Sequence, residues 1–111
     1  MEERIKNIFI RLLTDKKSYI DKYKSSSVYL VYNISSTKVT IANYIDVAKV
    51  PSFSVYIKDT SYPVMLSKRE LYTYEEIFNE IYKDIENQVI SEIEAELGSK
   101  SLEGDLIDEP F

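Results

Sequence analysis

Residues 28–34 read VYLVYNI, a run of β-branched and aromatic residues in which alternate positions fall on opposite sides of a strand. Similar runs follow at 38–47 (KVTIANYIDV) and 52–58 (SFSVYIK). Polar turn residues separate them at 35–37 and 59–61. We therefore expect three antiparallel strands. A short fourth strand is expected at 62–66 (YPVML), where Pro63 would confine it to an edge of the sheet.

Both flanks of this region have the periodicity of helices. In residues 2–24 the apolar side chains recur largely at spacings of three and four, which predicts an amphipathic helix. A second apolar stripe runs from Ile77 to Leu97. Two capping boxes precede it, Ser67-x-x-Glu70 and Thr73-x-x-Glu76, and we place the start of the long helix at the second. Gly98 is its expected end.

This order of elements predicts an α+β fold. We expect an antiparallel sheet of three to four strands with one face covered by the N- and C-terminal helices and the other face open. The expected domain spans residues 1–98. Residues 99–111 lack periodicity and are rich in Ser, Gly, Asp and Glu, so we expect a flexible acidic C-terminal tail.

The period of two assigns each strand residue to one face of the sheet. The expected core face carries Val28, Leu30, Tyr32, Ile34, Val39, Ile41, Ile45, Phe53, Val55 and Ile57. The opposite face carries Tyr29, Val31, Asn33, Lys38, Thr40, Ala42, Tyr44, Ser52, Ser54, Tyr56 and Lys58. A bulge within 43–47 would move Tyr44 to the core face.

One Tyr in each strand, with Lys beside it, suits single-stranded nucleic acid. Aromatic rings stack on unpaired bases, and Lys neutralises phosphates. The candidate nucleic-acid-binding residues are Tyr29, Asn33, Lys38, Thr40, Tyr44, Tyr56 and Lys58. Two other interpretations stay open: Tyr and Lys form ordinary cross-strand pairs in many sheets, and an exposed aromatic face can be a dimer interface.

The charge is divided unevenly along the chain. Residues 1–69 hold 12 Lys and Arg against 6 Asp and Glu, whereas residues 70–111 hold 2 against 13. A basic portion attracts polyanions, and an acidic end can occupy the basic surface when no ligand is bound. The basic residues Lys16, Lys17, Lys22 and Lys24 would either extend a binding groove or form the solvated side of the first helix. The acidic second helix is a solvated face or a mimic of a nucleic-acid backbone.

The last residues, Asp105-Leu-Ile-Asp-Glu-Pro-Phe111, resemble the acidic Pro-Phe tip of bacterial single-stranded DNA-binding proteins. Pro110 and Phe111 match that tip by position, and Asp105, Asp108 and Glu109 match its acidic cluster. Ile107 precedes Asp108 rather than Pro110, so the order is permuted. The resemblance implies that Phe111 docks in an apolar pocket of a replication or repair protein.

The body of the chain does not match the closed barrel of that family, whose turns are rich in Gly. The only two Gly residues, Gly98 and Gly104, lie outside the expected strands. The single-stranded DNA-binding proteins of archaeal rod-shaped viruses, with a helix-flanked sheet, are a looser comparison. We therefore expect a sequence-tolerant single-stranded DNA-binding protein of a different fold, such as the viral type.

Several function classes are disfavoured by composition. The chain has no Cys and no His, so thiolate and imidazole metal sites are excluded. Asp46 and Asp59 are the only carboxylates near strands, too few for a metal-dependent nuclease. We expect no enzyme activity, cofactor or metal, a cytoplasmic location (host cytoplasm for a viral protein) and no membrane partner. A homodimer is one candidate assembly, because a small open sheet has edges to protect. The alternative function is a small viral protein that binds and inhibits a host protein.

Overall fold

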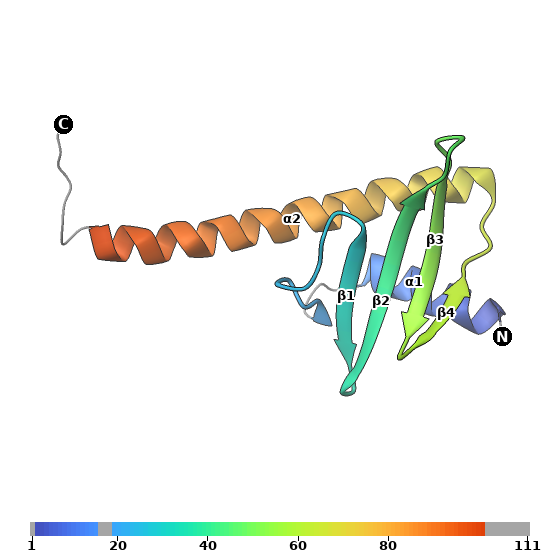
Figure 1. The fold of residues 1–111 in the computed structure, drawn as a ribbon, viewed down its shortest axis with the longest axis horizontal. Coiled ribbons are helices and arrows are strands. Elements are labelled where there is room, and N and C mark those ends of the chain that lie inside the picture. Colours follow the sequence, from blue (N-terminus) through green and yellow to red (C-terminus); the bar gives the residue numbers. More distant parts are fainter. Residues whose placement is uncertain (1, 16–18, 102–111) are drawn as a thin grey trace.

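The computed structural model describes residues 2–15 and 19–101. Helix α1 (Glu2–Thr14) precedes four strands, β1 (Tyr29–Ile34), β2 (Thr37–Ile45), β3 (Pro51–Ile57) and β4 (Thr60–Pro63), and helix α2 (Lys68–Ser101) follows them. The strands form one antiparallel sheet in the order β1-β2-β3-β4. Both helices lie behind the sheet in the view of Figure 1, which leaves the other face open. The predicted α+β fold is confirmed.

Short turns fix how the strands pair. Between β1 and β2 the two turn residues, Ser35 and Ser36, both have positive φ (49° and 65°), as a type I′ hairpin requires. Between β2 and β3 the Asp46 carboxylate accepts hydrogen bonds from the N–H groups of Ala48 and Val50, both at 2.9 Å. Strand β4 is an edge strand, the position predicted from its proline.

The core joins both helices to the covered face of the sheet. The Phe9 ring of α1 lies 5.0 Å from the Phe53 ring of β3, which lies 6.1 Å from the Phe78 ring of α2. All three are essentially inaccessible to solvent. The cluster around them includes Ile5, Leu13, Leu30, Tyr32, Val39, Ile41, Val55, Ile81 and Ile85. These contacts pack both helices against one face of the sheet, so the other face remains open.

The first helix is shorter than predicted. It ends at Thr14 rather than continuing to residue 24, and residues 20–26 run along the outer edge of β1. The Asp21 N–H donates to the Val31 carbonyl (2.7 Å), and the Val31 N–H donates to the Ser25 hydroxyl (3.0 Å). The unpaired backbone of an edge strand needs such partners, and that need outweighs the helical periodicity of this segment.

Helix α2 begins and ends outside its predicted limits. The first capping box is the one in use: the Ser67 N–H donates to the Glu70 carboxylate (2.9 Å), and the Glu70 N–H donates to the Ser67 hydroxyl (3.2 Å). Thr73 lies inside the helix, where its hydroxyl donates to the Arg69 carbonyl (3.0 Å). The predicted end at Gly98 is also wrong, since the helix continues to Ser101. The predicted tail from residue 102 onward lies outside the described residues.

The second half of α2 extends past the sheet. Phe78, Ile81 and Ile85 are buried against the strands, whereas residues 86–98 are exposed apart from half-buried Val89. We call residues 86–98 the stem. Figure 1 shows it projecting beyond β1. Its Glu92 carboxylate accepts hydrogen bonds from Lys22 and Tyr23, which ties the stem to the segment before β1.

Candidate nucleic-acid interface

The strand register places the predicted binding residues on the open face. Tyr29 of β1 lies opposite Ala42, and Ala42 lies opposite Ser54 of β3. One pleat further along, Val31, Thr40 and Tyr56 form the next row. Pairing is continuous from Thr37 to Ile45, so no bulge interrupts β2 and Tyr44 stays on this face. The alternation predicted from the sequence therefore holds across β1, β2 and β3.

Two residues assigned to the core face are exposed instead. Val28 precedes β1, and Ile45 is the last residue of β2, at the end of the sheet next to the Asp46 turn. Core burial on β2 ends at Asn43, whose side chain is buried opposite Phe53. Alternation assigns a face correctly, but burial also requires a covering element at that point along the strand.

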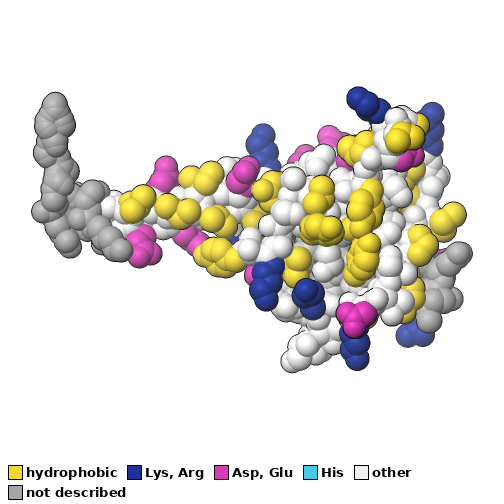
Figure 2. All heavy atoms as spheres, viewed as in Figure 1, with side chains coloured by type: hydrophobic (Ala, Val, Ile, Leu, Met, Phe, Trp, Pro, Cys, Tyr) yellow, Lys and Arg dark blue, Asp and Glu magenta, His cyan; other side chains and the backbone are white. Residues whose placement is uncertain are grey.

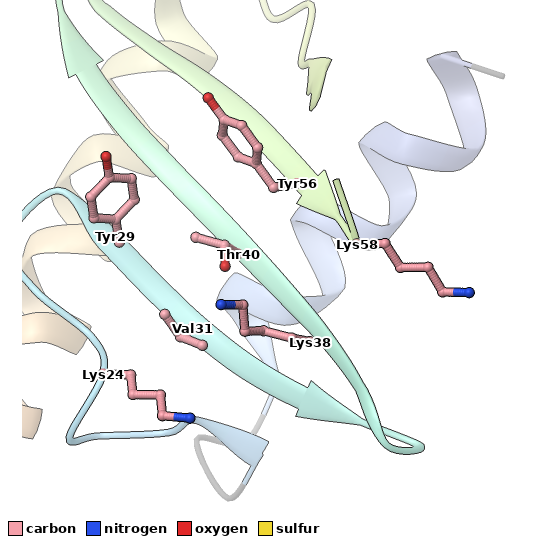
Figure 3. Close-up of a pocket in the computed structure, with 7 residues that line it drawn as sticks. All are labelled: Lys24, Tyr29, Val31, Lys38, Thr40, Tyr56 and Lys58. Carbon is pink, nitrogen blue, oxygen red and sulfur yellow. The ribbon is translucent and has the colours of Figure 1, made fainter. Parts of the chain in front are cut away.

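A shallow hollow of about 410 Å³ opens on this face. It is lined by Lys24, Tyr29, Val31, Lys38, Thr40, Tyr56 and Lys58. In Figure 3 the rings of Tyr29 and Tyr56 rise from β1 and β3, on either side of β2, and the Lys38 and Lys24 side chains lie toward the other end. The two outer strands are separated by two strand spacings, or about 10 Å. The two rings also belong to adjacent rows of the register, so they lie diagonally across β2.

The floor of the hollow is made of smaller side chains. Val31 is buried although it lies on the open face, and Thr40 beside it is half-buried. Val31 lies between Thr40 and the segment that contains Asp21 and Ser25. Thr40 lies between Val31 and Tyr56. The hollow therefore combines an apolar floor with aromatic walls, and its polar groups are one Thr hydroxyl, the Tyr hydroxyls and the Lys ammonium groups.

Two tyrosines on this face are joined through their hydroxyl groups. The Tyr44 and Tyr56 oxygens are 2.6 Å apart. The hydrogen bond to Tyr56 raises the pKa of Tyr44 to about 12, with smaller contributions from burial and from the nearby Tyr56 and Tyr29 phenols. Tyr44 is nevertheless 40% exposed and Tyr29 is 41% exposed. Both rings are thus available to a ligand.

All the charges in the lining of the hollow are positive. Lys24 pairs with Asp21 at 3.7 Å, but its side chain remains 69% exposed. Lys38 and Lys58 form no ion pair with any residue in the described part of the chain. Figure 3 shows Lys58 just after the end of β3, with its ammonium group pointing away from the two tyrosine rings. The lysine ammonium groups therefore lie around the two tyrosine rings of the hollow. Such a surface suits a polyanion that carries flat aromatic groups.

Figure 2 looks onto this face and shows hydrophobic side chains in columns over the strands, with basic side chains at both ends of the sheet. In the same view acidic side chains predominate along the part of α2 that projects past the sheet. The excess of carboxylates in the second part of the sequence therefore lies mainly on this helix, whereas the lining of the hollow has lysines and no carboxylate.

Five of the seven residues singled out from the sequence line the hollow: Tyr29, Lys38, Thr40, Tyr56 and Lys58. Tyr44 joins them through its bond to Tyr56. Asn33 lies outside the lining, exposed and opposite Lys38 at the end of β1. The lining also includes Val31, which alternation had placed on this face without a role, and Lys24, for which the sequence left open either an extension of the groove or the solvated side of the first helix. Only the path of residues 20–26 along β1 brings Lys24 to the site.

Part of the predicted site cannot be placed. The docking residues Asp105, Asp108, Glu109, Pro110 and Phe111 lie outside the described residues, as do Lys16 and Lys17. Asp46 is engaged in its own turn, as described above, and Asp59 lies in the β3–β4 turn. Within residues 2–15 and 19–101, no three His, Cys, Asp or Glu side chains form a group able to hold a metal ion.

None of the helices in the described part of the chain has the length and apolar character to cross a membrane. The chain matches no protein-family model, no curated protein and no solved structure.

Proposed function

We propose that this protein binds single-stranded DNA on the open face of its sheet, with little preference for sequence. The observation that carries the proposal is the hollow lined by two tyrosine rings and three lysines without a carboxylate. A surface of that composition complements unpaired bases and their phosphates. Double-stranded DNA suits it less, because paired bases hide their flat faces.

In the proposed binding, each kind of side chain in and near the hollow has its own role. Tyr29 and Tyr56 would stack on bases, each interaction contributing about 1–3 kcal/mol. Lys24, Lys38 and Lys58 would neutralise phosphates and release counterions, which makes binding salt-sensitive. The Thr40 hydroxyl and the Asn33 amide would hydrogen-bond to base edges or sugars. Stacking and phosphate contacts carry no sequence information, so the preference would be weak.

The test is a titration of the full chain with a labelled single-stranded oligonucleotide, followed by fluorescence anisotropy and by intrinsic Tyr fluorescence. We expect saturable binding that quenches Tyr emission and weakens as salt is raised. Tyr29→Ala should weaken it about tenfold or more. The matched control is Tyr72→Ala, which removes an exposed tyrosine of α2. Binding that is absent, insensitive to salt or equally affected by both variants would refute the proposal.

The resemblance of residues 105–111 extends the proposal to partner recruitment. Phe111, preceded by Pro110 and by the carboxylates of Asp105, Asp108 and Glu109, would dock in an apolar pocket with a basic rim on a replication or repair protein. Phe111→Ala should abolish capture of such a protein and leave oligonucleotide affinity unchanged. Loss of both would show instead that the residue belongs to the DNA-binding unit.

A second candidate function rests on the exposed apolar side chains of the stem. A small viral protein that binds and inhibits a host protein would present such a surface. Its test is capture from a host lysate by the full chain and by a chain lacking residues 102–111. A stoichiometric host partner retained by both, together with no oligonucleotide binding, would favour this function over the first.

A further inference from the structure

The stem carries an apolar stripe that is about half exposed to solvent. Ile90, Ile93 and Leu97 are 48%, 52% and 59% exposed, and Val89 adjoins them. Their spacings of three and four place them on one side of the helix. Lys22 and Tyr23 bond to Glu92, and Tyr23 shares a hollow with Val89 and Ile90, so the described contacts lie on one side of the stem. Most helical stability comes from packing of the apolar side, which favours further cover of the exposed part. The stripe is therefore a candidate contact surface.

The charge around the stripe limits what can cover it. Every charged residue of the stem is acidic: Glu86, Glu92, Glu94 and Glu96. Two stems placed side by side would bring these carboxylates together, which costs free energy. The lining of the sheet hollow has the opposite composition, with three lysines and no carboxylate. Two sheet faces placed together would repel for the same reason.

Contact between a stem and a sheet face would bury apolar side chains of both surfaces and bring opposite charges together. The apolar stripe would cover the rings of Tyr29 and Tyr56, while the bordering Glu86 and Glu94 would approach lysines such as Lys38 and Lys58. The same sheet already accepts a helix in this manner on its covered face, where Phe78 and Ile85 of α2 are buried. Charge and packing therefore both favour this pairing over contacts between like surfaces.

The stem of one molecule cannot reach its own open face. Helix α2 lies against the covered face of the sheet and continues past the β1 edge, away from the hollow (Figure 1). An intramolecular contact is therefore excluded, and the complementary surface is offered by a second copy of the chain. We propose that the stem of one copy docks on the open sheet face of another, in a head-to-tail contact that can continue from copy to copy.

The contact does not depend on DNA binding, although single-stranded DNA would compete with it if the proposed function holds. Because it pairs opposite charges, it should weaken as salt is raised. Each copy offers one stem and one face, so disabling either surface alone stops assembly. A copy with only a working stem and a copy with only a working face can still form one pair. Contacts between like surfaces do not behave in this way.

The test compares three variants with the wild-type chain by sedimentation velocity. Ile93→Asp disables the stem, Lys38→Glu disables the face, and Ser91→Asp places the same charge on the far side of the stem as a control. We expect salt-sensitive self-association of the wild type and of Ser91→Asp. The other two variants should each self-associate at least about tenfold more weakly. An equimolar mixture of them should form a 1:1 pair.

Two results would overturn the inference. One is a wild-type chain that stays monomeric at every concentration and salt. The other is a wild type that associates while the mixture of Ile93→Asp and Lys38→Glu forms no pair, which would indicate contact between like surfaces. Circular dichroism of each variant excludes unfolding. Oligonucleotide binding by monomeric Ile93→Asp, whose sheet face is intact, tests the proposed function separately.

Discussion

The hydroxyl oxygens of Tyr44 and Tyr56 lie 2.6 Å apart on the open face of the sheet. Tyr44 comes from β2 and Tyr56 from β3, and the paired residues Ala42 and Ser54 lie between their rows. These small side chains leave room for the two rings to lean together. The bond therefore orients both rings before any ligand arrives, which would lower the entropic cost of the base stacking proposed above.

This hydrogen bond should be visible in the titration of Tyr44. Removing its partner by Tyr56→Phe should lower the pKa of Tyr44 from about 12 toward the ordinary value of 10.0. Because the pKa is raised by folding, the associated stability is present below pH 10 and is lost as the pH rises through 12. Tyrosinate absorbance measured against pH checks the shift, and Tyr72→Phe, a change on α2, should leave Tyr44 unaltered.

Lys38 should set part of the salt dependence of DNA binding. Lys38→Gln removes one cation from the hollow, so we expect the slope of log affinity against log salt to fall by about one. The matched control, Lys68→Gln, changes an exposed lysine at the start of α2 and should leave the slope unchanged. Equal slopes for the wild type and Lys38→Gln would show that Lys38 contacts no phosphate.

The two capping sequences before and within α2 should respond differently to the loss of a hydroxyl. Ser67→Ala removes the acceptor of the Glu70 N–H and should lower the free energy of unfolding by about 1 kcal/mol. Thr73→Ala removes a hydroxyl bonded to a carbonyl inside the helix and should change it by less. Urea denaturation of both variants measures the difference. A larger loss of stability for Thr73→Ala would mean that α2 begins at the second capping box, with Thr73 as its cap.

We expect Asn43 to make the folded state less stable than an apolar residue at the same buried position would. Its side chain is buried on the core face, and its Oδ1 atom accepts no hydrogen bond from any residue in the described part of the chain. Asn43→Val replaces that unpaired acceptor with an apolar residue that suits a strand, so we expect a gain of about 1 kcal/mol. Thermal and urea unfolding test it. A clear loss of stability would mean that the amide is satisfied by water or serves another role.

Phe78 should be among the residues most important for stability. Its ring is fully buried and lies 6.1 Å from Phe53, at the point where α2 meets the sheet. Phe78→Ala should cost about 3–5 kcal/mol, because it removes buried apolar area and leaves a cavity. Leu97→Ala, an exposed change on the stem of the same helix, is the control and should cost much less in dilute solution. Similar losses in both would mean that the stem is packed in the monomer.

Alternation along the strands was sufficient to predict the sheet and its two faces. Tyr29, Thr40 and Tyr56 fall on one face because a strand has a period of two, and no later packing step changes that. The antiparallel order also followed from the short turns, and the positive φ values of Ser35 and Ser36 fit a two-residue hairpin. These features depend on local backbone geometry, which the sequence specifies directly.

The limits of the helices could not be predicted in this way. Residues 15–24 have helical spacing, yet Ile20 forms an isolated bridge with Tyr32 and Ser25 bonds to Val31, because the edge of β1 offers unpaired backbone groups. Likewise, the two capping boxes look equivalent in sequence, and only the path of the chain after β4 makes Ser67 the cap of α2.

The sequence by itself therefore determined the α+β class, the open face and most of the residues on it, since these follow from the strand period and from turn chemistry. Only the tertiary structure brought Lys24 into the lining of the hollow, paired the hydroxyls of Tyr44 and Tyr56, and left Ile90 and Ile93 of the stem about half exposed. Those features arise from contacts between segments distant in sequence. Such contacts depend on which surfaces remain free after the core has packed.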